Sequence, residues 1–475
     1  MKKIRNSKRN FSPVARPGPG TVVTVVGLAR SGTAAAEWLI RLGCLVRVTE
    51  ASISPALEQA AEQLRAAGVL IELGGHRREM IEEAQLVVTS PGVPLSAKPL
   101  QWAGKLGIPV VGELELGSWY CSGRIAAVTG SNGKSSVVTL LGEVLKKAGM
   151  DTVVCGNIGS PLTGQLGRIR PSTVVVLEVS SFQLETSLSF RPEIGCVLNV
   201  TDNHFDRHGS FEEYKAAKGR MFEFQRPGDW ALLNADDRGS FSFKKGTRGR
   251  LAFYSREEDV MGACIEGSSL CLTLPGISGE ICRRDEMALQ GPHHEQNALA
   301  VSCLAGMFGV RPEISGEVIR AFKGLPHRQQ VVEVFRGITF INDSKSTTVA
   351  SGLSAIQSAR GRVILIAGGM DKGSDFRTLR SLKNKIKAAV LIGRDGPKIA
   401  AALKGTVTCL MAASLAEAVR TAFGMAKEGE WVLLSPMCTS FDMFRDFEDR
   451  GEQFERIVTD LAGSVEPLAA AQGRL

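Results

Sequence analysis

The 475-residue sequence has few histidines, no closely paired cysteines and no long apolar run. No stretch approaches the roughly 18 apolar residues that a membrane-spanning helix needs, so no transmembrane segment is predicted. Ten cysteines are scattered singly between Cys44 and Cys438 without a Cys-x-x-Cys pair, which indicates neither a disulfide framework nor a zinc site. The six histidines form no His-Glu-x-x-His motif. We therefore expect a reduced, cytoplasmic protein in which any metal ion is bound by oxygen atoms.

Most of the chain also lacks an excess of either charge. The formal net charge is +8, but residues 1–20 contain six basic residues and no acidic one, which leaves only +2 for the rest. That is too little for the broad basic face that nucleic-acid binding needs, so we predict no nucleic-acid partner. Residues 1–20 lack the apolar core of a signal peptide and are predicted to form a basic disordered tail. A weak contact of this tail with a membrane or a nucleic acid stays open.

Three series of short apolar runs alternate with helical or turn-rich segments. The first holds "TVVTVVGLARSG" (residues 21–32), "LVRVTE" and "QLVVTSPGVP", the second holds "RIAAVTG", "TVVVLEVSS" and "EIGCVLNVT", and the third starts near Pro326 with "GITFINDSKSTT". Strands that alternate with helices favour parallel, doubly wound sheets, and a chain of this length exceeds a single core. We therefore expect three α/β units, with ligands beyond the carboxyl ends of their strands.

The segment "IAAVTGSNGKSSVVTLLGEVLKKAG" (residues 125–149) is typical of a phosphate-binding loop between a strand and a helix. Gly130 and Gly133 allow backbone N–H groups to approach phosphate oxygens, Lys134 supplies a mobile cation, and Ser135 or Ser136 can reach Mg²⁺. The spacing of the glycines matches only part of the general motif. An ordinary strand, turn and helix with an exposed lysine is the alternative.

The glycine turn "GLARSG" (residues 27–32) has Ala29 at the middle position of a dinucleotide-binding motif. Glu50 ends the next strand, 23 residues after Gly27, near the distance at which an acid meets a ribose or a base. The first unit is therefore a candidate for binding a nucleotide-bearing group, with a structural turn as the alternative.

Polar residues also follow two strands of the second unit. Glu178 ends a run of valines, and His204 with Asp206 lies just past the next strand. Lys218 falls in a helical pattern, and an unmodified ammonium group cannot bind a metal ion. Because Glu178 and His204 both follow strands that are expected to end near the phosphate loop, they are candidate Mg²⁺ ligands.

Seven segments, in this order along the chain, resemble those of the Mur ligases: "TGSNGKSS", "LEVSSFQLE", "NVTDNHFDRHGSFEEYKAAK", "GLPHR", "INDSKSTT", "LIAGGMDKGSDF" and "LLSPMCTSFDMFRDFEDRGEQF". The resemblance covers essentially the whole chain after residue 20. "INDSKSTT" points to the branch of the family that adds D-glutamate, since sister ligases and folate enzymes usually carry an Asp-x-x-His-x-Pro or Asp-x-Tyr segment there.

The resemblance implies an α/β protein of three domains, each built on a mainly parallel sheet. After the tail, these are a Rossmann-like UDP-substrate domain over residues 21–119, a central P-loop ATPase-like domain over residues 120–325 and a Rossmann-like amino-acid-binding domain over residues 326–475. It also implies an ATP-dependent ligase that joins D-glutamate to UDP-N-acetylmuramoyl-L-alanine through an acyl phosphate and a tetrahedral intermediate, a cytoplasmic step of peptidoglycan precursor synthesis. The expected cofactors are ATP and Mg²⁺, the expected partners are these small molecules, and we expect a monomer.

The family's functional residues match positions along the whole chain. ATP contacts are implied for Gly130, Ser131, Asn132, Gly133, Lys134, Ser135, Ser136, Asn297, Arg328 and Asp343. Mg²⁺ ligands are implied for Ser135, Glu178, His204 and Lys218, the last as a carbamate. Catalytic roles are implied for Lys134, His204, Lys218 and Lys345. The UDP substrate is expected at Ser31, Glu50, Ser90, Pro91, Gly92 and Asn157, and D-glutamate at Thr347, Lys372, Ser440 and Phe447. The chain departs from the family at Glu50, where aspartate is usual, and at His294, where asparagine is common.

Two other functions remain open from the sequence. Another member of the superfamily would join a different amino acid to a Mur or folate substrate. A nucleotide-binding regulator or scaffold would keep the fold without the chemistry, although such a protein needs neither two candidate metal ligands nor a carbamylation site. An assay of phosphate release with different amino acids distinguishes the D-glutamate ligase, another ligase of the superfamily and a protein without enzyme activity.

Overall fold

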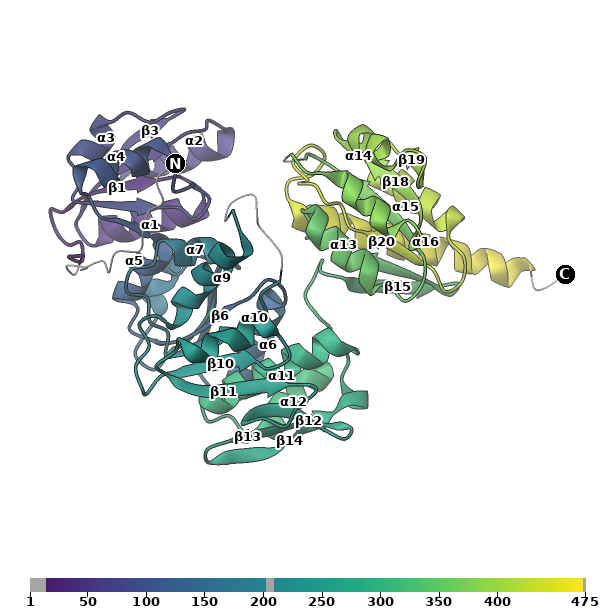
Figure 1. The fold of residues 1–475 in the computed structure, drawn as a ribbon. Coiled ribbons are helices and arrows are strands. Elements are labelled where there is room, and N and C mark those ends of the chain that lie inside the picture. The colour runs from purple at the N-terminus through teal and green to yellow at the C-terminus, as the bar shows by residue number, and fades with distance from the viewer. Residues whose placement is uncertain (1–13, 202–208, 372, 473–475) are drawn as a thin grey trace. The chain divides into compact units, whose positions relative to one another are not determined.

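The computed structural model describes residues 14–201, 209–371 and 373–472, which form three sheets with helices on both faces (Figure 1). Contacts divide the chain into two compact units, Met1–Phe322 and Lys323–Leu475. The first unit contains two sheets and the second contains one. The expected α/β fold with mainly parallel sheets is confirmed. Every helix in the described ranges is too short or too polar to cross a membrane.

The first sheet has five parallel strands in the order β3-β2-β1-β4-β5. Its strands are β1 (Val22–Val26), β2 (Leu45–Glu50), β3 (Leu70–Leu73), β4 (Leu86–Thr89) and β5 (Val110–Gly112). Its helices are α1 (Arg30–Arg41), α2 (Pro55–Ala66), α3 (Glu79–Glu82), α4 (Lys98–Leu106) and α5 (Glu113–Tyr120). Helices α1, α2 and α5 pack on one face and α3 and α4 on the other, which explains why β1 and β4 are apolar throughout apart from threonine.

Part of the predicted basic tail lies against this first sheet. Val14 packs against its core, the Pro17 carbonyl accepts a hydrogen bond from the Tyr120 hydroxyl, and Gly20 N donates to Gly43 O over 2.9 Å. The packed part of the chain thus includes residues 14–20. Residues 1–13 lie outside the described ranges.

Helix α5 links the first sheet to the second through two buried carboxylates. Glu113 accepts hydrogen bonds from Thr163 N (2.7 Å) and Thr163 Oγ1 (2.8 Å), and burial raises the pKa of Glu113. Glu115 accepts from Leu188 N and Ser189 N, both over 2.9 Å. Because a buried carboxylate is costly without such donors, these bonds fix where α5 contacts the central sheet.

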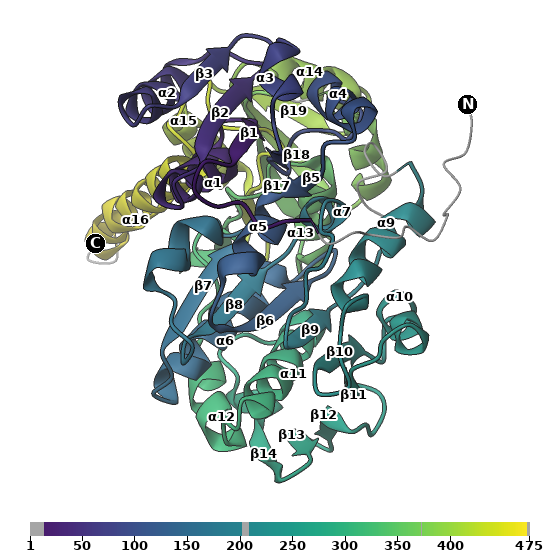
Figure 2. The same cartoon turned by 90° about the vertical axis from the view of Figure 1, so that its left-hand side faces the viewer.

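The central sheet has nine strands in the order β14-β13-β12-β11-β10-β9-β6-β8-β7. They are β6 (Arg124–Thr129), β7 (Thr152–Gly156), β8 (Val174–Glu178), β9 (Ile194–Val197), β10 (Trp230–Asn234), β11 (Arg250–Ser255), β12 (Gly262–Glu266), β13 (Ser269–Leu274) and β14 (Ile277–Arg283). Figure 2 shows β7, β8, β6 and β9 side by side. The strands from β7 to β12 are parallel, whereas β12-β13 and β13-β14 pair antiparallel, an extension that the sequence analysis did not predict.

Helices cover both faces of the central sheet. On one face lie α6 (Lys134–Lys147), α11 (Pro292–Met307) and α12 (Pro312–Ala321). On the other lie η1 (Thr163–Arg168), α7 (Ser181–Glu185), α9 (Phe211–Gly219), η2 (Arg220–Phe222), α10 (Arg238–Phe241) and η3 (Ser242–Lys245). A short turn of helix, η4 (Arg284–Glu286), follows β14. Because helices cover both faces, the central strands are continuous apolar runs rather than alternating patterns.

The third sheet has the strand order β15-β16-β20-β17-β18-β19, with only β15-β16 antiparallel. Its strands are β15 (Gln330–Phe335), β16 (Ile338–Asn342), β17 (Val363–Gly368), β18 (Ile386–Ile392), β19 (Thr408–Met411) and β20 (Trp431–Leu434). One face is covered by α13 (Val349–Ser358), η5 (Phe376–Leu382) and α14 (Gly396–Leu403), and the other by α15 (Leu415–Met425) and α16 (Phe447–Gln472).

Candidate active site

The predicted phosphate loop is a tight turn between β6 and α6. Gly133 has φ 83°, and a Cβ atom there would lie 2.8 Å from Asn297 Oδ1 on α11. Glycine is therefore required by both backbone conformation and space. Helix α6 begins at Lys134, so its N-terminal N–H groups and the positive end of its dipole lie at the loop. The loop has the features of an anion site, and Asn297, whose ATP contact stays a prediction, lies beside it.

Lys134 extends over this loop. Its Nζ donates to the carbonyl oxygens of Gly130 (2.7 Å) and Ser131 (3.1 Å). The ammonium group thus lies where phosphate oxygens would meet it.

Side chains from neighbouring segments support the loop. The Asn199 carboxamide accepts from Asn132 N (2.8 Å), and Ser131 Oγ lies 3.0 Å from the Tyr214 hydroxyl. Ser135 is buried in the first turn of α6, and Ser136 is partly exposed. Asn199 and Tyr214 were not singled out from the sequence, because nothing in their spacing marks a contact across about 70 or more residues.

Glu178 ends β8 with one carboxylate oxygen unpaired. The side chain is only 2% exposed, and its Oε1 accepts from Asn157 Nδ2 over 2.7 Å. Its Oε2 is buried and meets no hydrogen-bond donor from the described residues. Since β8 pairs with β6 so that Glu178 lies opposite Val128, this oxygen is close to the start of the phosphate loop. An unpaired buried carboxylate oxygen is costly, and a bound cation would compensate it.

Lys218 lies in α9 with a side chain that is only 1% exposed. Its Nζ donates to Thr129 Oγ1 over 3.4 Å and lies 4.5 Å from the centre of the Tyr214 ring. Burial first, and the charge of Lys134 second, hold the pKa of Lys218 well below its usual value. The lowered pKa makes the neutral amine, which is the form that reacts with carbon dioxide, more accessible than in an exposed lysine.

The predicted Mg²⁺ site is consistent with the described donors. Ser135 and Glu178 offer oxygen atoms from α6 and β8, which is the donor type that Mg²⁺ prefers. Lys218 joins this set only as a carbamate. His204 lies outside the described residues, so its predicted role stays a prediction.

A cavity of about 530 Å³ lies between turns of the first sheet and the end of β7. All six residues expected to hold the UDP substrate line it: Ser31, Glu50, Ser90, Pro91, Gly92 and Asn157. Its volume suits a small-molecule ligand. Asn157 lines the cavity and also binds Glu178, so it connects the cavity wall to the residue that ends β8.

Glu50 stabilises the glycine turn beside this cavity. Its two carboxylate oxygens accept from Leu28 N and Ser52 N, each over 2.9 Å. Gly27 has φ 95°, and a Cβ atom there would approach Ser90 Cβ to 2.9 Å. The turn is therefore fixed by a carboxylate on one side and by close packing on the other.

Among the further residues that line the cavity, three with polar side chains were missed from the sequence: Arg30, His76 and Gln183. Arg30 donates to Gly159 O over 3.1 Å, and it lies within the turn that the sequence analysis had already selected. His76 Nδ1 lies 2.8 Å from Thr49 Oγ1, and burial lowers the pKa of His76. Nothing in the sequence distinguishes His76 from an ordinary turn residue.

The remaining predicted ATP residues, Arg328 and Asp343, belong to the second unit. Asp343 directly follows β16 and accepts from Ser435 Oγ (3.0 Å) and Gln329 N (3.2 Å). Burial raises the pKa of Asp343 to about 6, although these hydrogen bonds and the charge of Arg328 act in the opposite direction.

The loop after β16 also contains Lys345 and Thr347, which are both partly exposed. Lys345 Nζ lies 5.2 Å from the centre of the Phe447 ring, so the structure brings these two predicted residues together. Ser440 is buried after β20. Lys372 lies outside the described residues.

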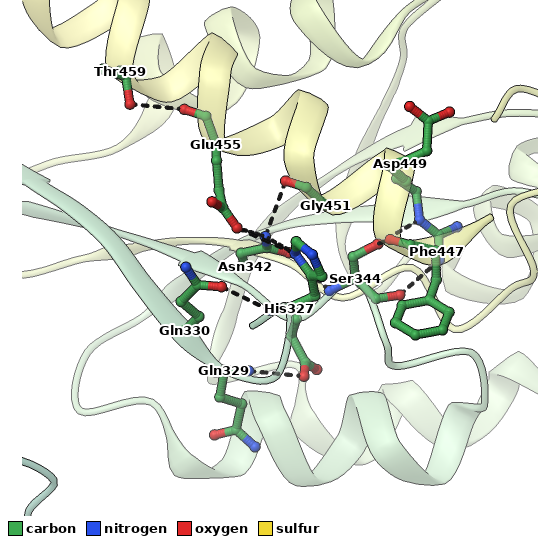
Figure 3. Close-up of polar contacts among 12 residues, drawn as sticks. His327, Gln329, Gln330, Asn342, Ser344, Phe447, Asp449, Gly451, Glu455 and Thr459 are labelled. Atoms are coloured by element: carbon green, nitrogen blue, oxygen red, sulfur yellow. Dashed lines mark hydrogen bonds and ion pairs between the residues drawn. The ribbon is translucent and has the colours of Figure 1, made fainter. Parts of the chain in front are cut away.

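A buried network holds this loop against the start of α16 (Figure 3). The fully buried Arg450 donates from Nε to Ser344 Oγ (2.9 Å), from Nη2 to Ser344 O (2.8 Å) and from Nη1 to Cys438 O (3.3 Å). Ser344 Oγ in turn donates to Phe447 O over 2.8 Å. A single arginine thus joins the loops after β16 and β20 to the first turn of α16.

A second part of the network holds the segment that contains Arg328 (Figure 3). Asn342 Nδ2 lies 2.9 Å from His327 Nδ1, and it donates to Glu455 Oε1 (2.8 Å) and Gly451 O (3.1 Å). A Cβ atom at position 451 would lie only 2.2 Å from His327 Nδ1. These positioning residues were not predicted from the sequence, although His327, Asn342 and Gly451 fall within the segments that resemble the Mur ligases.

Comparison with known families gives three matches along the chain. The family described as Mur ligase MurD-like, N-terminal domain matches residues 21–112. The Mur ligase middle domain matches residues 128–305, and the Mur ligase glutamate ligase domain matches residues 327–438.

Similar proteins extend over nearly the whole chain. A protein of Pelotomaculum thermopropionicum is 44% identical over 443 residues, which cover 92% of this chain and 97% of that protein. One from Koribacter versatilis is 39% identical and covers 93% and 98%, respectively. Both carry the name UDP-N-acetylmuramoylalanine--D-glutamate ligase.

Solved structures are similar in fold. The UDP-N-acetylmuramate-alanine ligase MurC of Thermotoga maritima has a TM-score of 0.56 at 16% identity and covers 92% of this chain and 99% of that structure. The MurF ligase of the same organism, in complex with ADP, has a TM-score of 0.54 at 14% identity and covers 94% and 96%. At these identities the similarity concerns the fold alone.

Proposed function

The chain belongs to the Mur ligase family, and from this premise we propose that it joins D-glutamate to UDP-N-acetylmuramoyl-L-alanine with hydrolysis of ATP to ADP and phosphate. This reaction is a cytoplasmic step of peptidoglycan precursor synthesis. One structural observation supports the proposal most. The cavity lined by all six expected UDP-substrate residues is linked through Asn157 to Glu178, beside the phosphate loop.

The proposed reaction has two steps. An oxygen of the substrate carboxylate attacks the γ-phosphorus of ATP, the bond to the β-phosphate oxygen breaks, and an acyl phosphate and ADP form. The neutral amine of D-glutamate then attacks the acyl carbon, and the tetrahedral intermediate expels phosphate as the amine loses a proton. Because charge accumulates on phosphoryl oxygens, positioned cations and N–H donors supply most of the catalysis.

Different residues of the chain are proposed to bind ATP, the acyl phosphate and D-glutamate. The loop from Gly130 to Ser136 would bind the phosphates, and Lys134 would place its positive charge on them. Asn297, Arg328 and Asp343 are proposed to bind the rest of ATP. Lys345 would neutralise the acyl phosphate. D-Glutamate is proposed to bind at Thr347, Lys372, Ser440 and Phe447.

Mg²⁺ would be held by Ser135, Glu178, His204 and the carbamate of Lys218. Bound there, it would neutralise phosphate charge during transfer. The unpaired buried oxygen of Glu178 and the neutral tendency of Lys218 support this set.

The test of function is phosphate release from ATP with UDP-N-acetylmuramoyl-L-alanine and one amino acid at a time. We expect release with D-glutamate and background release with L-glutamate, L-alanine, L-lysine and meso-diaminopimelate. Release with a different amino acid would assign another substrate to the same chemistry. No release with any of them would contradict the proposed enzyme activity.

Glu178→Gln is expected to raise the Mg²⁺ concentration for half-maximal turnover by about tenfold or more. The amide oxygen still accepts the bond from Asn157, so the change removes mainly the negative charge. The measurement is a Mg²⁺ titration of phosphate release at saturating ATP. Glu193→Gln, at a partly exposed ion pair with Arg124, is the matched control. An unchanged Mg²⁺ requirement would remove Glu178 from the proposed ligands.

A further inference from the structure

The hairpin of β12 and β13 brings two cysteines together at the antiparallel end of the central sheet (Figure 1). Cys264 lies directly opposite Cys271 in the register, and Glu266 ends β12 on the same face as Cys264. The two cysteines are seven residues apart in sequence, a spacing that matches no common zinc motif. Only the two-residue turn after Glu266 places them side by side.

Two carboxylates complete this group, which we name the hairpin cluster: Asp259, Cys264, Glu266 and Cys271. Cys264 Sγ lies 3.7 Å from Asp259 Oδ1 and 3.8 Å from Glu266 Oε1. Asp259, Cys264 and Glu266 each have one ligand atom within 4.8 Å of the ligand atoms of the other two. Cys271 is placed beside them by its pairing with Cys264. Tetrahedral coordination with Zn–S near 2.3 Å and Zn–O near 2.0 Å separates sulfur from oxygen by about 3.5 Å. The observed spacing is close to this value.

The cluster has an excess of potential negative charge. Cys264 is buried and Cys271 is half-buried, whereas the carboxylates of Asp259 and Glu266 are exposed. Within the described ranges, neither Asp259 nor Glu266 forms an ion pair with a lysine or arginine. A divalent cation would compensate the carboxylates and favour the thiolates at the same time.

We propose that the hairpin cluster binds one Zn²⁺ ion through Asp259, Cys264, Glu266 and Cys271. Binding breaks the two S–H bonds, releases both protons to solvent and forms two Zn–S bonds.

The expected consequence is local. Asp259 belongs to the connection between β11 and β12, so the ion would join this connection to the hairpin. In the sheet order, β12 lies four strand positions from β6, which corresponds to about 19 Å from the strand that carries the phosphate loop. Zn²⁺ would thus stabilise the edge of the sheet without entering the ATP site.

The test uses the full-length protein after chelation and reduction with a non-chelating phosphine, with Mg²⁺ in excess to occupy oxygen-rich sites. We expect one equivalent of Zn²⁺ by calorimetry, an affinity that rises with pH and a higher unfolding temperature. Co²⁺ in place of Zn²⁺ should give a thiolate-to-metal charge-transfer band, which a site made only of oxygen and nitrogen donors cannot produce.

Three variants identify the ligands. Cys264→Ser should weaken Zn²⁺ binding at least tenfold and remove about half of the charge-transfer intensity, because only the Cys271 thiolate remains. Glu266→Gln should weaken Zn²⁺ binding at least tenfold, and Cys409→Ser, at a half-buried thiol in the second unit, should change neither the affinity nor the band. All three should keep the ATP-dependent turnover of the unmodified protein. A missing band in the unmodified protein, a band of unchanged intensity in Cys264→Ser, or no uptake of Zn²⁺ by the reduced protein would overturn the proposal.

Discussion

Lys134→Ala is expected to lower the rate of phosphate release by at least about 10³-fold, the range associated with loss of a cation from a phosphoryl-transfer site. Lys134 Nζ already lies over the loop, in contact with Gly130 O and Ser131 O. Its charge would stabilise the phosphoryl oxygens more strongly in the transition state than in the bound nucleotide. The measurement is single-turnover and steady-state phosphate release at saturating ATP and both substrates.

The control for Lys134→Ala is Lys146→Ala, an exposed lysine near the end of the same helix. We expect the control to keep full activity and both variants to keep the unfolding temperature of the parent protein within a few degrees. Near-normal turnover of Lys134→Ala would contradict the assignment of residues 130–136 as the phosphate site. A collapse of its unfolding temperature would instead assign Lys134 a structural role.

Lys218→Ala is expected to reduce turnover by at least about 10²-fold, and added bicarbonate should not restore it. The reason is the loss of the amine that would carry the carbamate, beside Thr129 at the end of β6. Intact-mass measurement of the parent protein under carbon dioxide should show one added carboxyl group that the variant lacks. Lys215→Ala, on the same helix but partly exposed, is the matched control and should lose little activity.

Measuring the stability of Lys218 variants distinguishes a catalytic role of the carbamate from a role of the side chain in packing. Because the pKa of the unmodified amine is lowered in the folded protein, ionisation of Lys218 does not affect stability above the usual lysine pKa. As the pH falls from that value toward the lowered pKa, the unfolded state binds the proton first and the folded protein becomes less stable. In carbon dioxide-free buffer, Lys218→Met should therefore unfold less readily than the parent near neutral pH, while remaining inactive. A variant that is both less stable and inactive would support a mainly structural role for Lys218.

Several local features of the fold could be predicted from short stretches of sequence. The valine run before Glu178 forms a fully buried strand, and the helix after Gly133 begins at Lys134, because apolar runs and glycine turns act over a few residues. The strands β13 and β14 were not predicted, since their mixed polar and apolar residues resemble a loop. The contact of residues 14–20 with the first sheet was also missed, because composition does not reveal packing partners.

In the candidate site, too, residues close together in the sequence could be predicted and contacts between distant segments could not. The residues of the phosphate loop could be selected from the sequence because they are adjacent. The partners that hold them, such as Asn199 and Tyr214, could not be selected because they come from distant segments. The Arg450 network was missed for the same reason, since a lone arginine in a helix indicates an exposed side chain far more often than a buried one.

The sequence by itself determined the α/β class, the order of the motifs and the chemical character of the candidate site, because each depends on periodicity or on residues close together in the chain. Only the tertiary structure decided which donors lie together. It placed one carboxylate oxygen of Glu178 beside the loop without a donor from the described residues, buried Lys218 so that its pKa is lowered, and set Cys264 opposite Cys271. The physical reason is that burial, pKa and coordination geometry depend on distances in space, and these distances are set by strand order and register rather than by sequence spacing.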